Sequence, residues 1–104
     1  MERLQKIIVL CIGIMAKKKE TKYINKRVVT AQIKELARRN TQSFSVMIST
    51  SYKSLFKKEL ISLRGNYVAL NKSGLALAKQ IRQEIVDKYD GIDWDIIRRF
   101  YEKT

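Results

Sequence analysis

The sequence predicts a mainly α-helical fold with one small β-hairpin, and three observations support this prediction. Apolar residues recur at helical spacing in several segments of the 104-residue chain. Proline, which breaks helices, is absent. Two short runs, at residues 60–63 and 67–70, flank the turn sequence Arg64-Gly65-Asn66 and predict a hairpin. The length argues for a single domain, and a hydrophobic content of 45% is enough for a small core.

The first predicted helix covers about residues 3–19. Its apolar stripe starts at Leu4 and includes Cys11, which we expect to lie in the core. A membrane role is disfavoured because Lys17 ends the apolar run well before the roughly 20 residues that a transmembrane helix needs. An export role is disfavoured because no small-residue cleavage pattern precedes the lysines. Met15 is an alternative start that would remove most of this helix.

An extended stretch is predicted next, over residues 22–24 and 27–29, because β-branched residues are frequent there. Thr30 follows as a candidate N-cap, since its hydroxyl accepts from free amides of a first helical turn. The helix that it begins is predicted over residues 31–39.

The next helix is predicted over residues 45–58, after a polar break at residues 40–43 with Phe44 as a buried residue in that turn. One side of this helix is apolar and includes Tyr52, which we assign to the core. The opposite side carries small hydroxyls and long cations within an arc of roughly 100°. Its residues are Val46, Ser49, Thr50, Lys53 and Lys57.

Two further helices are predicted after the hairpin. Asn71 caps a long helix, which ends near Gly91, and Asp93 caps a final short helix. The expected stripe of the long helix is Leu75, Ala78, Ile81, Ile85 and Tyr89, and that of the short one is Trp94, Ile97, Phe100 and Tyr101.

The composition argues against an enzyme. The chain has no histidine and a single cysteine, so it lacks the ligand set of a zinc site and the base of a nucleophilic triad. Four aspartates, at positions 87, 90, 93 and 95, lie near predicted helix ends, where capping explains them better than acid–base chemistry. We therefore expect no catalytic residue, no metal and no cofactor.

The net charge of +12 points to a polyanionic partner. A small domain needs only about 2–8 net charges for solubility. The charge is also unevenly spread, because residues 1–83 carry a net +14 and residues 84–104 a net −2. We expect the first part to meet the polyanion and the last part to serve another purpose.

The predicted order of elements resembles that of the winged helix-turn-helix superfamily, in particular small regulators of the MarR and PadR kind. The resemblance rests on Val29-Thr30-Ala31-Gln32-Ile33-Lys34-Glu35-Leu36-Ala37 as the first motif helix. It also rests on residues 52–61 as a recognition helix entering a strand, and on residues 64–76 as a wing followed by a capped helix. The turn between the two motif helices is about three residues longer than usual.

The resemblance implies a double-stranded DNA-binding protein whose helix at residues 45–58 enters the major groove. The hairpin, called the wing in that superfamily, would contact backbone or minor groove. A helix fits the major groove, and hydroxyls and lysines bond to base edges or phosphates. The predicted DNA-binding residues are Gln42, Ser43, Ser49, Thr50, Lys53, Lys57, Arg64 and Asn66. Further phosphate contacts are expected from Lys17, Lys18, Lys19, Lys22, Arg38, Arg39 and Lys72.

The sequence divides into a DNA-binding domain at residues 1–86 and a helical extension at residues 87–104. The extension carries more apolar surface than a monomer of this size is expected to bury, which predicts a homodimer built from the last two helices. The alternative is that the last helix folds back on its own domain.

The leading function is a homodimeric transcription regulator acting as a repressor, in the cytoplasm and associated with the nucleoid. A second interpretation is a DNA partition, centromere-binding or architectural protein that coats DNA. A third interpretation is a protein-interaction adaptor, which would show no salt-dependent DNA binding.

Overall fold

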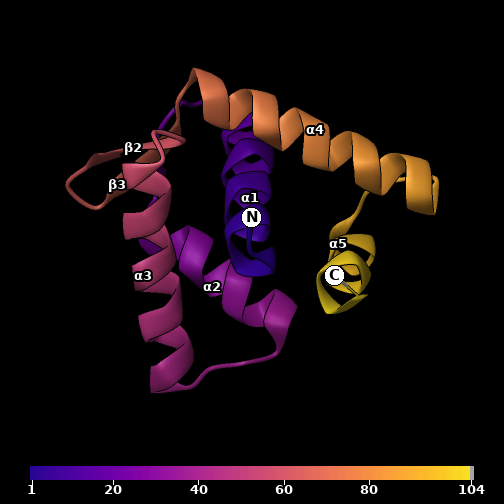
Figure 1. Ribbon diagram of the computed structural model, residues 1–104, viewed down its shortest axis with the longest axis horizontal. Helices are drawn as coiled ribbons and strands as arrows, with labels where there is room; N and C mark the ends of the chain where they lie inside the picture. The colour runs from indigo at the N-terminus through magenta and orange to yellow at the C-terminus, as the bar shows by residue number, and fades with distance from the viewer. Residues whose placement is uncertain (104) are drawn as a thin grey trace.

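The computed structural model describes residues 1–103 and confirms a helix-rich fold with a small antiparallel sheet. The central helix is α1, and the other helices surround it (Figure 1). In chain order the elements are α1 (Arg3–Lys19), β1 (Ile24–Asn25), α2 (Lys26–Ala37), α3 (Gln42–Lys57), β2 (Ile61–Arg64), β3 (Tyr67–Leu70), α4 (Lys72–Tyr89) and α5 (Trp94–Lys103).

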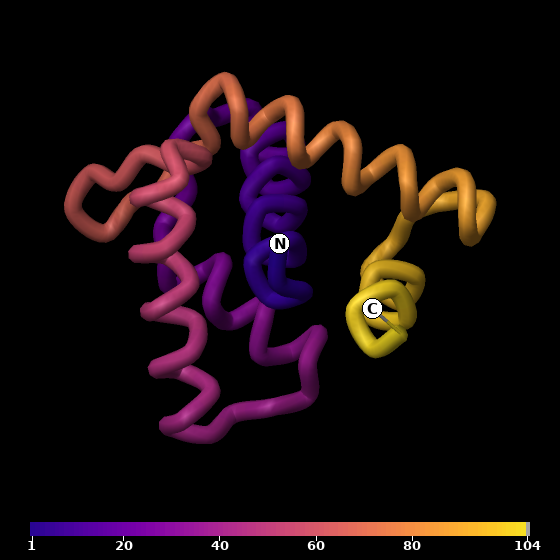
Figure 2. The backbone as a smooth tube through the Cα atoms, in the orientation of Figure 1, coloured from indigo at the N-terminus to yellow at the C-terminus, as the bar shows by residue number. Residues whose placement is uncertain are grey.

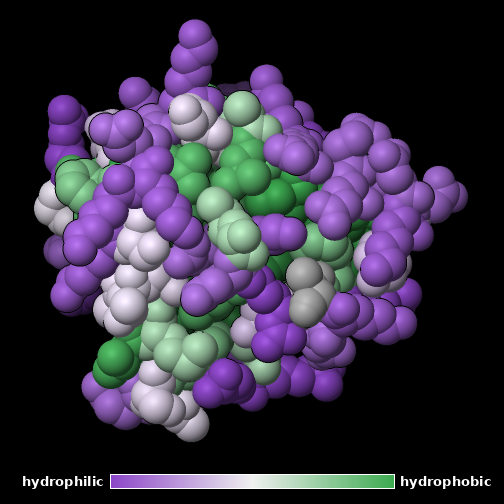
Figure 3. All heavy atoms as spheres, viewed as in Figure 1, coloured by the Kyte–Doolittle hydropathy of each residue, from purple (hydrophilic) through white to green (hydrophobic). Residues whose placement is uncertain are grey.

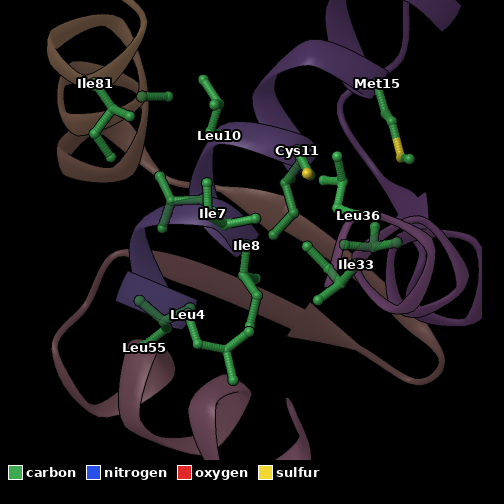
Figure 4. Packing of buried hydrophobic residues seen from close by; sticks show 14 of the residues in the cluster. Leu4, Ile7, Ile8, Leu10, Cys11, Met15, Ile33, Leu36, Leu55 and Ile81 are labelled. Atoms are coloured by element: carbon green, nitrogen blue, oxygen red, sulfur yellow. The ribbon is translucent and has the colours of Figure 1, made fainter. Parts of the chain in front are cut away.

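The core is built around α1, whose residues from Ile7 to Ile12 are all fully or almost fully buried. Figure 4 shows this helix in the middle of the cluster, with Leu55 of α3, Ile33 and Leu36 of α2, and Ile81 of α4 around it. Cys11 is fully buried, as predicted. A helix that is apolar around most of its circumference is expected to be central, because every side faces another element.

The helix α2 starts earlier than predicted. Asn25 caps it by accepting a hydrogen bond from the backbone nitrogen of Arg27 at 2.9 Å, so the predicted cap, Thr30, lies inside the helix. The extended stretch predicted over residues 27–29 is therefore wrong, and only Ile24–Asn25 forms a strand. β-branched residues disfavour a helix only weakly, and burial of Val29 outweighs that cost.

The helix α3 also starts earlier, at Gln42 rather than residue 45. Thr41 is the cap, and its hydroxyl accepts from the backbone nitrogen of Phe44 at 3.2 Å. The placement of Phe44 in the connecting turn is therefore wrong, because it lies in the first helical turn and is fully buried there. The helix α2 ends at Ala37 rather than residue 39, so the connection is residues 38–41 instead of the predicted 40–44. Arg38 turns the chain there with a left-handed backbone (φ 53°).

The predicted hairpin is present, and a third strand joins it. β3 lies in the middle of the sheet, with β2 on one side and the short β1 on the other, all antiparallel. The registers pair Ile24 with Val68 and Leu63 with Val68. Gly65 makes the tight turn between β2 and β3, where its positive φ of 57° suits a residue without a side chain.

The last two helices have the predicted caps: Asn71 Oδ1 accepts from Gly74 N at 3.0 Å, and Asp93 Oδ1 accepts from Ile96 N at 2.8 Å. The expected stripe of α4 is wrong at Leu75, which is 49% exposed. The final helix, α5, packs against α1, α2 and α4 of the same chain. Its buried side chains, Ile97, Phe100 and Tyr101, belong to the main core.

The elements around α1 fall into two groups on opposite sides of this helix. The backbone tube shows α3 and the hairpin on one side of α1, and the end of α4 with α5 on the other (Figure 2). The arginine of α1, Arg3, ties α5 to the core, because its guanidinium lies 4.7 Å from the Tyr101 ring centroid and donates to the Tyr101 carbonyl at 3.3 Å. The boundary expected between residues 86 and 87 falls within α4.

Candidate nucleic-acid interface

The outward face of α3 gathers most of the predicted DNA-binding residues. Because α3 begins at Gln42, that residue joins the polar arc at the helical spacing of 100° per residue. No acidic residue occurs in α3. We call this surface the α3 face, and all its residues are exposed: Gln42, Val46, Ser49, Thr50, Lys53 and Lys57.

The opposite side of α3 is held firmly against α1. Leu55 is fully buried there, and the buried Gln5 of α1 links the two helices. Its amide nitrogen donates to Ser54 Oγ at 3.1 Å, and its carbonyl oxygen accepts from Lys58 Nζ at 2.8 Å. These contacts fix the rotation of α3 about its own axis, so the α3 face keeps one orientation relative to the core.

A basic hollow of about 390 Å³ lies between α2, α3 and the hairpin turn. It brings together two predicted residues from different elements, Ser49 of α3 and Asn66 of the hairpin turn. The cations of this hollow, Lys26, Arg27 and Lys34, are not among the residues predicted from the sequence. The residues that line it are Lys26, Arg27, Thr30, Ala31, Lys34, Ser49, Tyr52 and Asn66.

The hollow is built by the start of α2. The backbone nitrogen of Lys26 donates to the carbonyl of Asn66 at 2.8 Å, which joins the hairpin turn to the helix. The ammonium group of Lys26 lies 5.9 Å from the centroid of the Tyr52 ring. Three cations therefore converge beside hydroxyl and amide groups, which is an arrangement that suits a phosphate.

The sequence contains a signal for this hollow. A helix predicted from residue 26 would have placed Lys26, Arg27, Thr30 and Lys34 at i, i+1, i+4 and i+8, on one side of that helix.

Tyr52 forms the floor of the hollow and is mostly buried, as the sequence predicts. Burial raises the pKa of its hydroxyl to about 12, still further above neutral pH than the ordinary value of a tyrosine. A neutral hydroxyl adds no negative charge to the hollow. Burial likewise raises the pKa of the Cys11 thiol above its ordinary value, which suits a core residue rather than a nucleophile.

The other predicted residues lie outside the hollow. Ser43 is in the first turn of α3, where its hydroxyl is 3.2 Å from that of Thr41. Arg64 ends β2, is exposed, and stacks its guanidinium 5.0 Å from the centroid of the Tyr23 ring. The aromatic contact limits the positions that this guanidinium adopts, and no carboxylate of residues 1–103 pairs with it.

Ion pairs do not neutralise this side of the molecule. Within residues 1–103 the one ion pair shorter than 4 Å joins Arg98 to Asp95 at 3.2 Å, on α5. The cations of the α3 face and of the basic hollow therefore have no carboxylate partner among the described residues. Their positive potential is available to an external anion.

A second hollow, larger and mainly apolar, lies on the α4 and α5 side. This apolar groove has a volume of about 930 Å³ and runs between the C-terminal half of α1, the first half of α4 and the start of α5. Its apolar walls include the half-exposed Leu75 and the partly buried Trp94. Cations line it as well, namely Lys17, Lys18, Lys22, Lys79 and Arg82.

Within residues 1–103, no helix is long and apolar enough to cross a membrane, and no three side chains of the metal-ligating kind lie together. Comparison of the chain with protein-family models, curated proteins and solved structures gives no match. The inference of function therefore rests on the α3 face, the basic hollow and the hairpin.

Proposed function

We propose that the protein binds double-stranded DNA as a winged-helix protein, with α3 in the major groove. The observation that carries the proposal is the α3 face: six exposed residues on one arc, two of them lysines, with no acid on the helix. A major groove about 12 Å wide admits one helix. The firm attachment of α3 to α1 presents this arc to a groove without a rearrangement.

The basic hollow supplies the backbone contacts in this proposal. A phosphate beside the groove is held by Lys26, Arg27 and Lys34, with hydroxyls of Thr30 and Ser49 as further partners. Because the hollow adjoins α3, this phosphate contact fixes how far α3 enters the groove. The hairpin turn reaches the neighbouring backbone, where Arg64 adds one more contact. Single-stranded nucleic acid is a less suitable ligand, because the three described strands contain a single aromatic residue, the exposed Tyr67, and therefore form no stacking platform.

Replacing Arg64 with alanine tests the hairpin contact. Each phosphate contact contributes a slope of about −0.9 to the plot of log affinity against log salt. We expect Arg64→Ala to weaken duplex binding and to reduce the steepness of that slope by about one for each bound subunit, because each subunit then releases one counterion fewer. The measurement is fluorescence anisotropy of a labelled duplex across several salt concentrations. The matched control is Arg99→Ala on α5, which should leave the slope unchanged; a slope that Arg64→Ala also leaves unchanged contradicts the hairpin contact.

We further propose that two copies pair through the apolar groove. Folding of α5 onto its own domain buries Ile97, Phe100 and Tyr101, so the groove is the apolar surface that remains on this side of the molecule. The segment at residues 84–104 carries a net −2, while the groove walls carry five cations and two acids, Glu20 and Asp93, and are therefore net positive. In a dimer with a two-fold axis, residues 84–104 of each chain would lie beside the cations that line the groove of the other chain.

Leu75→Asp is expected to convert the dimer into a 12.2 kDa monomer, because it places a charge in the apolar contact. The matched control is Phe56→Asp, since Phe56 is exposed to a similar degree (51%) but lies on α3. Light scattering at low protein concentration measures the mass. A wild-type protein that is already 12.2 kDa, or a dimer that survives Leu75→Asp, contradicts pairing through the groove.

The biological role that best suits such a dimer is a transcription repressor that occludes a promoter. Two α3 helices in one dimer read half-sites about 34 Å apart on an inverted repeat. Footprinting separates this role from the architectural one, since a repressor protects a fixed short repeat. A footprint that lengthens with protein concentration instead indicates a protein that coats DNA.

A further inference from the structure

The α3 face carries one apolar side chain, an exposed valine in the N-terminal half of the helix. Val46 is 55% exposed, and Met47 beside it is 45% exposed. The space-filling view shows apolar atoms over the N-terminal half of α3, next to hydrophilic side chains (Figure 3). Val46 is flanked along the arc by Gln42 one turn before it and Thr50 one turn after it.

The residues that reach bases first come from the N-terminal half of a recognition helix. In α3 that half contains no arginine, lysine or carboxylate, since its lysines, Lys53 and Lys57, lie further along. It therefore lacks the side chains that read guanine and that accept from cytosine N4. Gln42 is suited to adenine, through its bidentate pairing with N6 and N7. This half of the helix is chemically matched to A·T pairs.

Val46 completes this match, because the 5-methyl group of thymine is the apolar group that base edges present in the major groove. A valine side chain is also stiff at χ1 within a helix, so its methyl groups lose little freedom when they meet a partner. Contact with an apolar group of the partner removes this exposed isopropyl group from water, which lowers the free energy of the complex.

We propose that Val46 and Gln42 make the protein select A·T base pairs through the major groove, with Val46 packed against thymine methyl groups. This inference rests on the proposed function and adds the class of sequence that is read. Readout through the methyl group is separable from phosphate binding, because removal of a methyl leaves every phosphate in place.

The experiment uses the duplex most enriched from a random-sequence pool by the wild-type protein. We expect its centre to be rich in A·T pairs. A second version carries deoxyuridine in place of thymidine, which removes only the 5-methyl groups. We expect wild-type binding to weaken about fourfold for each methyl in contact. A third version replaces the central A·T pairs by inosine·cytosine, which keeps the minor-groove edge and changes the major groove; binding to it should also weaken.

The variants assign the effect to one side chain. Val46→Ala is expected to bind the thymidine and deoxyuridine duplexes with nearly equal affinity. The matched control is Val28→Ala, because Val28 is also exposed (40%) but lies on α2 and does not line the basic hollow, and it should keep the wild-type preference.

The possible results distinguish failure of A·T selection from failure of the proposed DNA binding. Equal affinity of the wild type for the thymidine and deoxyuridine versions overturns the thymine contact, and so does a preference that Val46→Ala retains in full. Undiminished binding to the inosine·cytosine version, or an enriched duplex with a G·C centre, overturns major-groove selection of A·T pairs. In each of those cases salt-dependent binding leaves the proposed function standing, whereas binding to no duplex at any salt removes the proposed function itself.

Discussion

Replacing Lys53 and Lys57 together with alanine is expected to abolish sequence-specific binding of duplex DNA while leaving the fold intact. The two lysines lie one turn apart on the α3 face, and both side chains are exposed. A side chain in specific contact with a base edge is worth about 1–3 kcal/mol. Loss of both therefore weakens binding by a factor on the order of 100 or more.

The measurement is gel retardation and anisotropy with the selected duplex. The matched control removes two charges elsewhere, with Lys88→Ala and Lys103→Ala in the C-terminal segment. That variant has the same net charge as the first but should bind almost as well as the wild type. Equal losses in the two double variants would mean that net charge alone determines affinity, and that α3 does not enter the groove.

Gly74→Ala is expected to destabilise the fold severely. A Cβ atom added at Gly74 would clash with the carbonyl oxygen of Leu60, a backbone atom that cannot move aside easily. The same carbonyl accepts from the backbone nitrogen of Asn71 at 3.1 Å, so this corner joins the start of α4 to the chain entering β2. Overpacking of this kind costs about 3 kcal/mol, a large part of the roughly 5–15 kcal/mol that stabilises a small domain.

Thermal unfolding followed by circular dichroism measures this effect. A loss of about 3 kcal/mol lowers the midpoint by roughly 12–24 °C in a domain of this size. The control is Gly91→Ala, where an added Cβ meets only Ile96 Cδ1 at an ordinary 3.7 Å. Similar midpoints for the two variants would show that α4 does not begin against Leu60.

Local pattern was sufficient for much of this fold. The bounds of α1, the hairpin turn at Gly65 and the caps Asn71 and Asp93 all follow from nearby residues. The start of α3 was harder, because Asn40, Thr41 and Ser43 are all capable N-caps and only the burial of Phe44 decides between them. Tertiary packing makes that decision, and a local pattern does not contain it.

The candidate site was predicted in part for the same reason. The α3 face is a helical arc, which periodicity reveals as soon as the helix is identified. The basic hollow joins Lys26 and Lys34 of α2 to Ser49 and Asn66, which lie far apart in sequence. Its two lysines share a side only because α2 begins at Lys26, so the misplaced cap at Thr30 hid the hollow.

The most direct test of the account is the salt dependence of duplex binding by the wild-type protein. The α3 lysines, the three cations of the basic hollow and Arg64 make six contacts in all. Six such contacts in one subunit predict that its affinity for a single half-site falls by about 1,000-fold between roughly 50 mM and 200 mM salt, and a dimer on both half-sites depends on salt more steeply. Affinity for duplex DNA that is absent at the lowest salt, or that is insensitive to salt, would contradict the account.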